Sequence, residues 1–120
     1  MAPKSGMDLI NDAKTRIREV TPAQVREMRA RGESAVYLDV REPNEWNLGH
    51  LPGATHIPRG TLETRVEAVV PRDRKVVIYC AGGNRSALAA DTLQQMGYQD
   101  VVSMSGGFTG WAQSGGDVEG

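Results

Sequence analysis

The stretch from Val76 to Leu93, VVIYCAGGNRSALAADTL, decides how this chain folds. It opens with an apolar, β-branched run typical of a buried strand and closes with a run typical of a helix. Between the two runs lie Cys80, which is the chain's only cysteine, two glycines and Arg85. The pattern predicts a strand, a tight loop and a helix, with the single thiol at the carboxyl end of the strand.

Length and composition narrow the class of protein. A chain of 120 residues is long enough for one domain with its own core, without disulfides or metals. Fourteen basic and fifteen acidic side chains give a net charge of −1, which argues against nucleic acid or an anionic membrane as a partner. The N-terminal 20 residues lack the apolar run of a secretory signal, so a cytoplasmic location is expected. One cysteine and two histidines predict no metal site and no resident cofactor.

Strands alternate with helices along the chain. Ser5 and Thr21 have the spacing of helix N-caps, with Asp8 and Gln24 completing two capping boxes. Helices are predicted over residues 5–17, 21–32, 61–70, 86–97 and 106–113, with one further turn after Pro43. Strands are predicted over residues 35–40, 55–58, 75–80 and 101–104. This alternation predicts an α/β fold in three layers, with a mostly parallel sheet of about five short strands and helices on both faces.

The loop after Cys80 has features that stabilise an anion. Gly82 and Gly83 allow backbone conformations in which successive N–H groups turn inward as an anion-binding nest. Ser86 is expected to be the N-cap of the following helix, whose N-terminus carries partial positive charge. Arg85 adds a full charge with a planar fork of donors. We therefore expect a reactive thiolate, because a cysteine that only packed in the core would need none of these neighbours.

Three segments resemble the rhodanese-type sulfurtransferase domain. CAGGNRS (80–86) resembles the active-site loop of that family, LDVREPNEWNLGHLPGATHIP (38–58) its upstream signature, and SGGFTGW (105–111) its closing segment. The order of the three segments along the chain is also that of the family. The resemblance implies a rhodanese-like domain over residues 21–120, preceded by an N-terminal helical extension over residues 1–20.

The resemblance also implies a chemistry. Cys80 would take the outer sulfur of a donor, such as thiosulfate or a persulfide, and hold it as a persulfide until a second nucleophile collects it. Because the chain has no second cysteine, the acceptor must be an external thiol, cyanide or a cysteine of a partner protein. Cys80 and Arg85 are then the expected catalytic residues, and the expected substrate-binding residues are Ala81, Gly82, Gly83, Asn84 and Ser86.

Two alternatives use the same cysteine and arginine. A sulfur-relay protein, loaded by one partner and unloaded by another, differs in its partners and not in its chemistry. Related phosphatases and arsenate reductases have five residues between cysteine and arginine, whereas here four residues, Ala81 to Asn84, separate them. The shorter loop fits a single sulfur atom better than a tetrahedral phosphate. The family also includes binding modules, but those usually lack the cysteine.

Other polar residues near these segments are expected to support the backbone. Asp39 and Arg41 are interpreted as a structural pair. Glu45 is expected to bind Arg41 or a nearby amide, and His50 to pack and form hydrogen bonds. The glycine-rich end of the chain predicts a mobile tail. The oligomeric state stays open.

Overall fold

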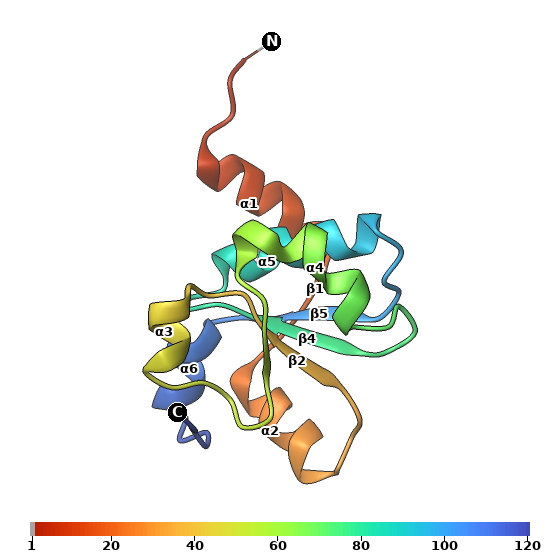
Figure 1. The fold of residues 1–120 in the computed structure, drawn as a ribbon. Helices are drawn as coiled ribbons and strands as arrows, with labels where there is room; N and C mark the ends of the chain where they lie inside the picture. Colours follow the sequence, from red (N-terminus) through yellow and green to blue (C-terminus); the bar gives the residue numbers. More distant parts are fainter. Residues whose placement is uncertain (1) are drawn as a thin grey trace.

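A five-stranded parallel sheet forms the centre of the fold (Figure 1). The computed structural model describes residues 2–120. Its strands are β1 (Arg18–Val20), β2 (Val36–Asp39), β3 (Thr55–His56), β4 (Val76–Tyr79) and β5 (Val101–Met104). Its helices are α1 (Gly6–Lys14), α2 (Pro22–Ala30), α3 (Pro43–Asn47), the 3-10 turn η1 (Arg59–Thr61), α4 (Leu62–Val69), α5 (Asn84–Gln95) and α6 (Gly107–Gln113). The predicted α/β fold with a parallel sheet is confirmed.

Strand β4 lies in the middle of the sheet, whose strand order is β1-β5-β4-β2-β3. Val76 at its start is in register with Val36 of β2 and Val101 of β5. All four residues of β4 are buried, as expected for a β-branched run with helices on both sides. The residue after β4 is Cys80, so the thiol stands at the carboxyl edge of the sheet, where α/β proteins bind ligands.

Alternate side chains of β4 enter two separate cores. Val76 and Ile78 pack with apolar residues of α4 and α5 on one face. Val77 and Tyr79 pack with α2 and α6 on the opposite face. Figure 1 shows the same three layers, with α1, α4 and α5 on one side of the sheet and α2 and α6 on the other. Period-two alternation in one short strand thus connects both helical layers.

The predicted helix starts are confirmed at both capping boxes. The Ser5 hydroxyl accepts from the amide of Asp8, and the Asp8 carboxylate accepts from the amide of Ser5. Thr21 and Gln24 repeat the arrangement at the start of α2. None of the helices within residues 2–120 combines the length and the apolar content that crossing a membrane requires.

The segment before residue 21 is not wholly helical, which corrects the prediction of a helical extension. Helix α1 ends at Lys14, and residues 18–20 form the edge strand β1, which pairs with β5. The pairing continues beyond the strand, where Ser105 donates its amide to the Val20 carbonyl. The strand was not predicted because it has only three residues, and two of them, Arg18 and Glu19, are charged and exposed. Such a segment has no apolar strand pattern. The domain boundary at residue 20 stays a prediction.

The C-terminal segment is tethered, which contradicts the predicted mobile tail. The backbones of Glu119 and His50 exchange two hydrogen bonds of 2.8 and 2.9 Å. The Trp111 indole donates to the Asp117 carbonyl at 2.8 Å. Glycine content alone predicted mobility, whereas backbone pairing with a distant segment holds the tail against the loop after α3.

Two buried tyrosine hydroxyls differ in their partners. The Tyr98 hydroxyl donates to the Val70 carbonyl at 2.7 Å. Among the buried side-chain polar atoms of residues 2–120, only the Tyr37 hydroxyl has no hydrogen-bond partner. A buried hydroxyl without a partner loses its bonds to water and gains nothing in exchange.

Replacing each tyrosine by phenylalanine should therefore have opposite effects. We expect Tyr98→Phe to lower the free energy of unfolding by about 1 kcal/mol, and Tyr37→Phe to leave it unchanged or raise it slightly. Urea denaturation of both variants measures the difference. A loss at Tyr37 equal to that at Tyr98 would show that the Tyr37 hydroxyl has a partner in solution.

Candidate functional site

The loop between β4 and α5 brings the predicted site residues together. Helix α5 begins at Asn84, and Gly83 is its N-cap with φ +105°. This corrects the prediction that Ser86 caps the helix, because Ser86 already lies in its first turn. The conformation of Gly83 turns the chain sharply from the strand into the helix, and a side chain would be strained there.

The sulfur of Cys80 lies inside this turn. Gly83 donates its amide to Sγ at 3.1 Å, and Ser86 donates its amide to Sγ at 3.3 Å. The Cys80 side chain is buried, with 1% of the residue exposed. Two N–H donors aimed at one sulfur form an anion-binding arrangement at the N-terminus of a 12-residue helix. The arrangement therefore places two hydrogen-bond donors where they can stabilise negative charge on the sulfur.

The hydroxyl of Ser86 connects the loop to the sheet. Its Oγ donates to the Gly83 carbonyl at 3.2 Å and lies 2.8 Å from the hydroxyl of Ser103 in β5. The Cys80 sulfur lies 3.5 Å from the same Oγ. Both serines are completely buried. Ser86 thus has two roles, because its amide contacts the sulfur while its side chain fixes the loop on the neighbouring strand.

Helix α6 supports the loop from behind. Phe108 and Thr109 donate their amides to the carbonyls of Cys80 and Ala81, at 2.7 and 3.1 Å. Gly107 precedes them with φ +56°, and a Cβ at this position would lie 2.5 Å from both of those carbonyl oxygens. Only glycine allows so close an approach of two backbones. The segment SGGFTGW (105–111) therefore supports the loop of residues 80–83, which we call the sulfur loop.

Arg85 forms an ion pair with Glu45 of α3. Its Nη1 and Nη2 donate to Oε1 and Oε2 of Glu45 at 2.8 and 3.1 Å. The Arg85 hydrogen bond, outweighing partial desolvation, lowers the pKa of the Glu45 carboxyl to about 2. The Glu45 hydrogen bond likewise raises the pKa of Arg85, and the nearby Cys80 adds a smaller effect in the same direction.

Glu45 also has one of the two alternative partners predicted for it. Its Oε1 accepts from the amide of Glu42 at 3.0 Å, so the expected bond to a nearby amide is confirmed. Arg41, the other alternative, binds Asp39 instead. No sequence pattern linked Glu45 to Arg85, since 40 residues separate them.

The buried Asp39–Arg41 pair organises the carboxyl edge of the sheet. Arg41 donates from Nη2 to Asp39 at 2.8 Å and to the Gly49 carbonyl at 2.7 Å. Its own carbonyl contacts the imidazole of His56, and its guanidinium lies 4.3 Å from the centre of the Phe108 ring. The pair thus joins β2, the segment after α3, β3 and α6, in line with the structural role predicted for it.

The predicted substrate-binding residues differ in their exposure to solvent. Gly82 and Asn84 are exposed and Ala81 is half-buried, whereas Gly83 and Ser86 are buried. Within residues 2–120, no three or more His, Cys, Asp or Glu side chains are grouped so that they could hold a metal ion. The chemistry that the loop offers is therefore that of one thiol, backbone amides and one guanidinium.

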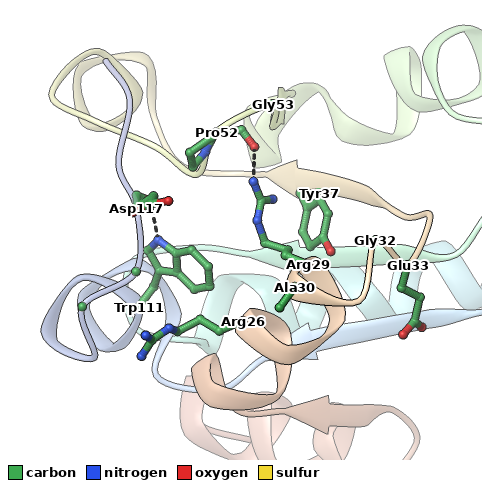
Figure 2. A pocket seen from close by; sticks show the side chains of 12 residues that line it. Arg26, Arg29, Ala30, Gly32, Glu33, Tyr37, Pro52, Gly53, Trp111 and Asp117 are labelled. Carbon is green, nitrogen blue, oxygen red and sulfur yellow. Dashed lines mark hydrogen bonds between the residues drawn. The ribbon is translucent and has the colours of Figure 1, made fainter.

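A groove of about 680 Å³ lies apart from the sulfur loop (Figure 2). It is bounded by α2, residues 52–53 and the end of the chain, and it includes none of the predicted site residues. Figure 2 shows Arg29 between Tyr37 and Trp111, donating to the Pro52 carbonyl at 2.8 Å. Arg26 donates to the Ser114 carbonyl across the same groove. These two arginines hold its walls together, and Cys80 is not among the residues that line it.

Comparisons with known proteins found a family model and several similar proteins. The family model described as "Rhodanese-like domain" matches residues 21–114. A protein named "Sulfurtransferase" from Allochromatium vinosum is 34% identical over 99 residues, which are 82% of this chain and 92% of that protein. The "Probable adenylyltransferase/sulfurtransferase MoeZ" of Mycobacterium tuberculosis is 36% identical over 95 residues. That match covers 78% of this chain and only 24% of the longer protein.

A solved structure from Rhodopseudomonas palustris is similar over almost the whole chain. It has a TM-score of 0.90 and 35% identity, and the match covers 99% of this chain and 97% of that one. It is described as a protein of unknown function, "Possible Tyrosine Phosphatase".

The backbone contact at Gly107 predicts a difference between two glycines with positive φ. Gly107→Ala should lower the free energy of unfolding by roughly 2–5 kcal/mol, because it adds a clash to the conformational strain. Gly115 also has positive φ but open space around its Cβ position, so Gly115→Ala should cost only about 1–2 kcal/mol. Urea denaturation compares the two. Equal losses would contradict the close support of the loop by α6.

The Glu45–Arg85 pair predicts a pH dependence of stability. The pKa of Glu45 is lowered from 4.5 to about 2, so the folded state binds this proton less readily than the unfolded state. The stabilisation is then fully present above pH 4.5 and is lost as the pH falls towards 2.

We expect the difference in unfolding free energy between wild type and Glu45→Gln to shrink over that pH range. Titration of the Glu45 side-chain carbon by NMR measures the same pKa directly. A midpoint near 4.5 would show that the ion pair is not formed in solution.

Proposed function

The chain belongs to the rhodanese-like domain family, and from this premise we propose that it is a sulfurtransferase that carries sulfane sulfur as a persulfide on Cys80. The observation that carries the proposal is the pair of amides, from Gly83 and Ser86, that donate to the Cys80 sulfur. They stabilise the thiolate, which is the nucleophilic form of cysteine. The sulfurtransferase from A. vinosum, which this chain matches over most of its length, supports the same reading.

In the first half-reaction the Cys80 thiolate attacks the outer sulfur of the donor. With thiosulfate, the sulfur–sulfur bond of the donor breaks, its electron pair leaves with sulfite, and a new sulfur–sulfur bond forms on Cys80. We propose that the loop residues Ala81, Gly82 and Asn84, together with Arg85, form the binding site for the terminal sulfur, which carries the negative charge. The reacting form is the thiolate, so the attack itself transfers no proton.

In the second half-reaction an external thiolate or cyanide attacks the terminal sulfur. The bond to Cys80 breaks, and its electron pair restores the Cys80 thiolate. Since the sequence contains one cysteine, no internal thiol competes for this sulfur. Two half-reactions through a covalent intermediate give ping-pong kinetics. A sulfur relay between partner proteins would use the same two steps, and a cytoplasmic location remains a prediction from the sequence.

Phosphate ester hydrolysis fits the site less well. It requires an acid that protonates the leaving alcohol. The carboxyl beside the loop is that of Glu45, and its pKa of about 2 keeps it ionised at neutral pH. The four-residue spacing between Cys80 and Arg85 also favours a single sulfur over a phosphate. We therefore place phosphatase activity second.

The proposal is tested by the mass of the intact protein. After incubation with thiosulfate or an organic persulfide, wild type should gain one sulfur atom, and cyanide or a thiol should remove it. Cys80→Ser should gain nothing under the same conditions. Ser114→Cys, which adds a thiol on the exposed surface to the Cys80→Ser background, controls for sulfur uptake by any cysteine.

Two results would count against the proposal. The first is that no donor loads wild type although Cys80 is reduced and can be alkylated. The second is that the surface cysteine of the control loads as readily as Cys80. Hydrolysis of an aryl phosphate that depends on Cys80 would instead support the phosphatase alternative.

A further inference from the structure

The proposed function does not say which donors the site prefers, and the Glu45–Arg85 pair bears on that question. We propose that Glu45 is a specificity-determining residue, which occupies the anion-binding face of Arg85 and so selects against dianionic sulfur donors. The favoured donor class is then a persulfide of low charge, in which the sulfane sulfur is carried on a thiol. This inference rests on the proposed function and concerns the same site.

The first argument is the geometry of the pair. A guanidinium binds an oxyanion through two parallel N–H groups, and both terminal nitrogens of Arg85 already bind the two oxygens of Glu45. An anionic donor that used Arg85 in this way would have to displace the carboxylate. The two side chains are 37% and 29% exposed, so part of their interaction is protected from solvent.

The second argument is that Glu45 is fixed in its place. Its Oε1 also accepts from the Glu42 amide at the start of α3. The next residue, Trp46, stacks between the rings of His50 and His56, with centroid distances of 3.4 and 4.8 Å. Moving the Glu45 carboxylate away from Arg85 would also break its hydrogen bond with the Glu42 amide, and that loss costs free energy.

The third argument is the balance of charge. Glu45 and, more weakly, Glu42 act on the guanidinium of Arg85, and both raise its pKa. The nucleophile itself is an anion when it reacts. A dianion such as thiosulfate thus approaches one cation that faces two carboxylates and a thiolate, whereas a persulfide brings little charge. Like charges at short range disfavour the first donor.

The favoured reaction is balanced without any further reactant. The Cys80 thiolate attacks the outer sulfur of R–S–SH, the sulfur–sulfur bond of the donor breaks, and its electron pair leaves with R–S⁻. The product on the protein is Cys80–S–SH. The Cys80 sulfur is oxidised to the same extent that the departing R–S sulfur is reduced, so no further oxidant or reductant is needed.

The experiment compares two donors on three proteins. The donors are thiosulfate and the persulfide of 2-mercaptoethanol, whose reacting form R–S–SH has no net charge. The readout is the second-order rate of persulfide formation on Cys80, followed by intact mass. The proteins are wild type, Glu45→Gln and Glu67→Gln. Glutamine at position 45 keeps an oxygen for the Glu42 amide while it removes the charge. Glu67 of α4 pairs with Arg72 at 2.8 Å, so Glu67→Gln makes the same change in net charge within another ion pair.

We expect Glu45→Gln to raise the rate with thiosulfate by roughly tenfold and the rate with the 2-mercaptoethanol persulfide by less than about twofold. Glu67→Gln should change neither rate. An equal change for both donors, a lower rate with thiosulfate, or no change in either rate would overturn the inference. In the second case Glu45 would instead hold Arg85 in its working position.

A binding measurement separates this inference from the proposed function. Sulfate is a dianion that cannot transfer sulfur, and calorimetry measures its affinity for Cys80→Ser with and without Glu45→Gln. The double variant should bind sulfate roughly tenfold more tightly. Failure of every donor to load wild type would reject the function, whereas unchanged sulfate affinity would reject the role of Glu45 alone.

Discussion

A charge buried at the carboxyl edge of the sheet has to be paired, and the rest of the site is built around that requirement. The side chains of Asp39 and Arg41 are almost fully buried, so neither is stable there without the other. Arg41 uses its remaining donor and its carbonyl on Gly49 and His56. The loop that carries α3 is thereby held beside the sulfur loop, which is why Glu45 can reach Arg85 at all.

The site thus has two parts with different physical origins. The inner part consists of backbone amides around the sulfur, fixed by the conformation of Gly83 and by the contact of α6 at Gly107. These amides stabilise negative charge on sulfur whatever the donor is. The outer part is ionic and consists of side chains, Arg85 and Glu45, from two different elements. The first part suits the chemistry of a persulfide, and the second bears on which molecules deliver the sulfur.

Local patterns predicted the inner part and missed the outer one. The apolar run of β4, the glycines and the start of α5 lie within 20 residues, so the sequence alone indicated an anion site at Cys80. The capping residue was misplaced because a glycine with positive φ begins the helix before the serine does. The edge strand β1 is short and charged, and its pairing with β5 is a contact between distant segments. The Glu45–Arg85 pair is equally non-local, and no single-sequence pattern encodes such a contact.

The end of the chain has a practical consequence for handling the protein. Glu119 forms a two-stranded bridge with His50, whose ring stacks on Trp46, the residue after Glu45 in α3. Residues 2–5 project away from the sheet, beyond α1 (Figure 1). A purification tag, fluorophore or surface linkage joined after Gly120 would therefore pull on the rim of the site, whereas the same attachment at the N-terminus would leave that rim undisturbed.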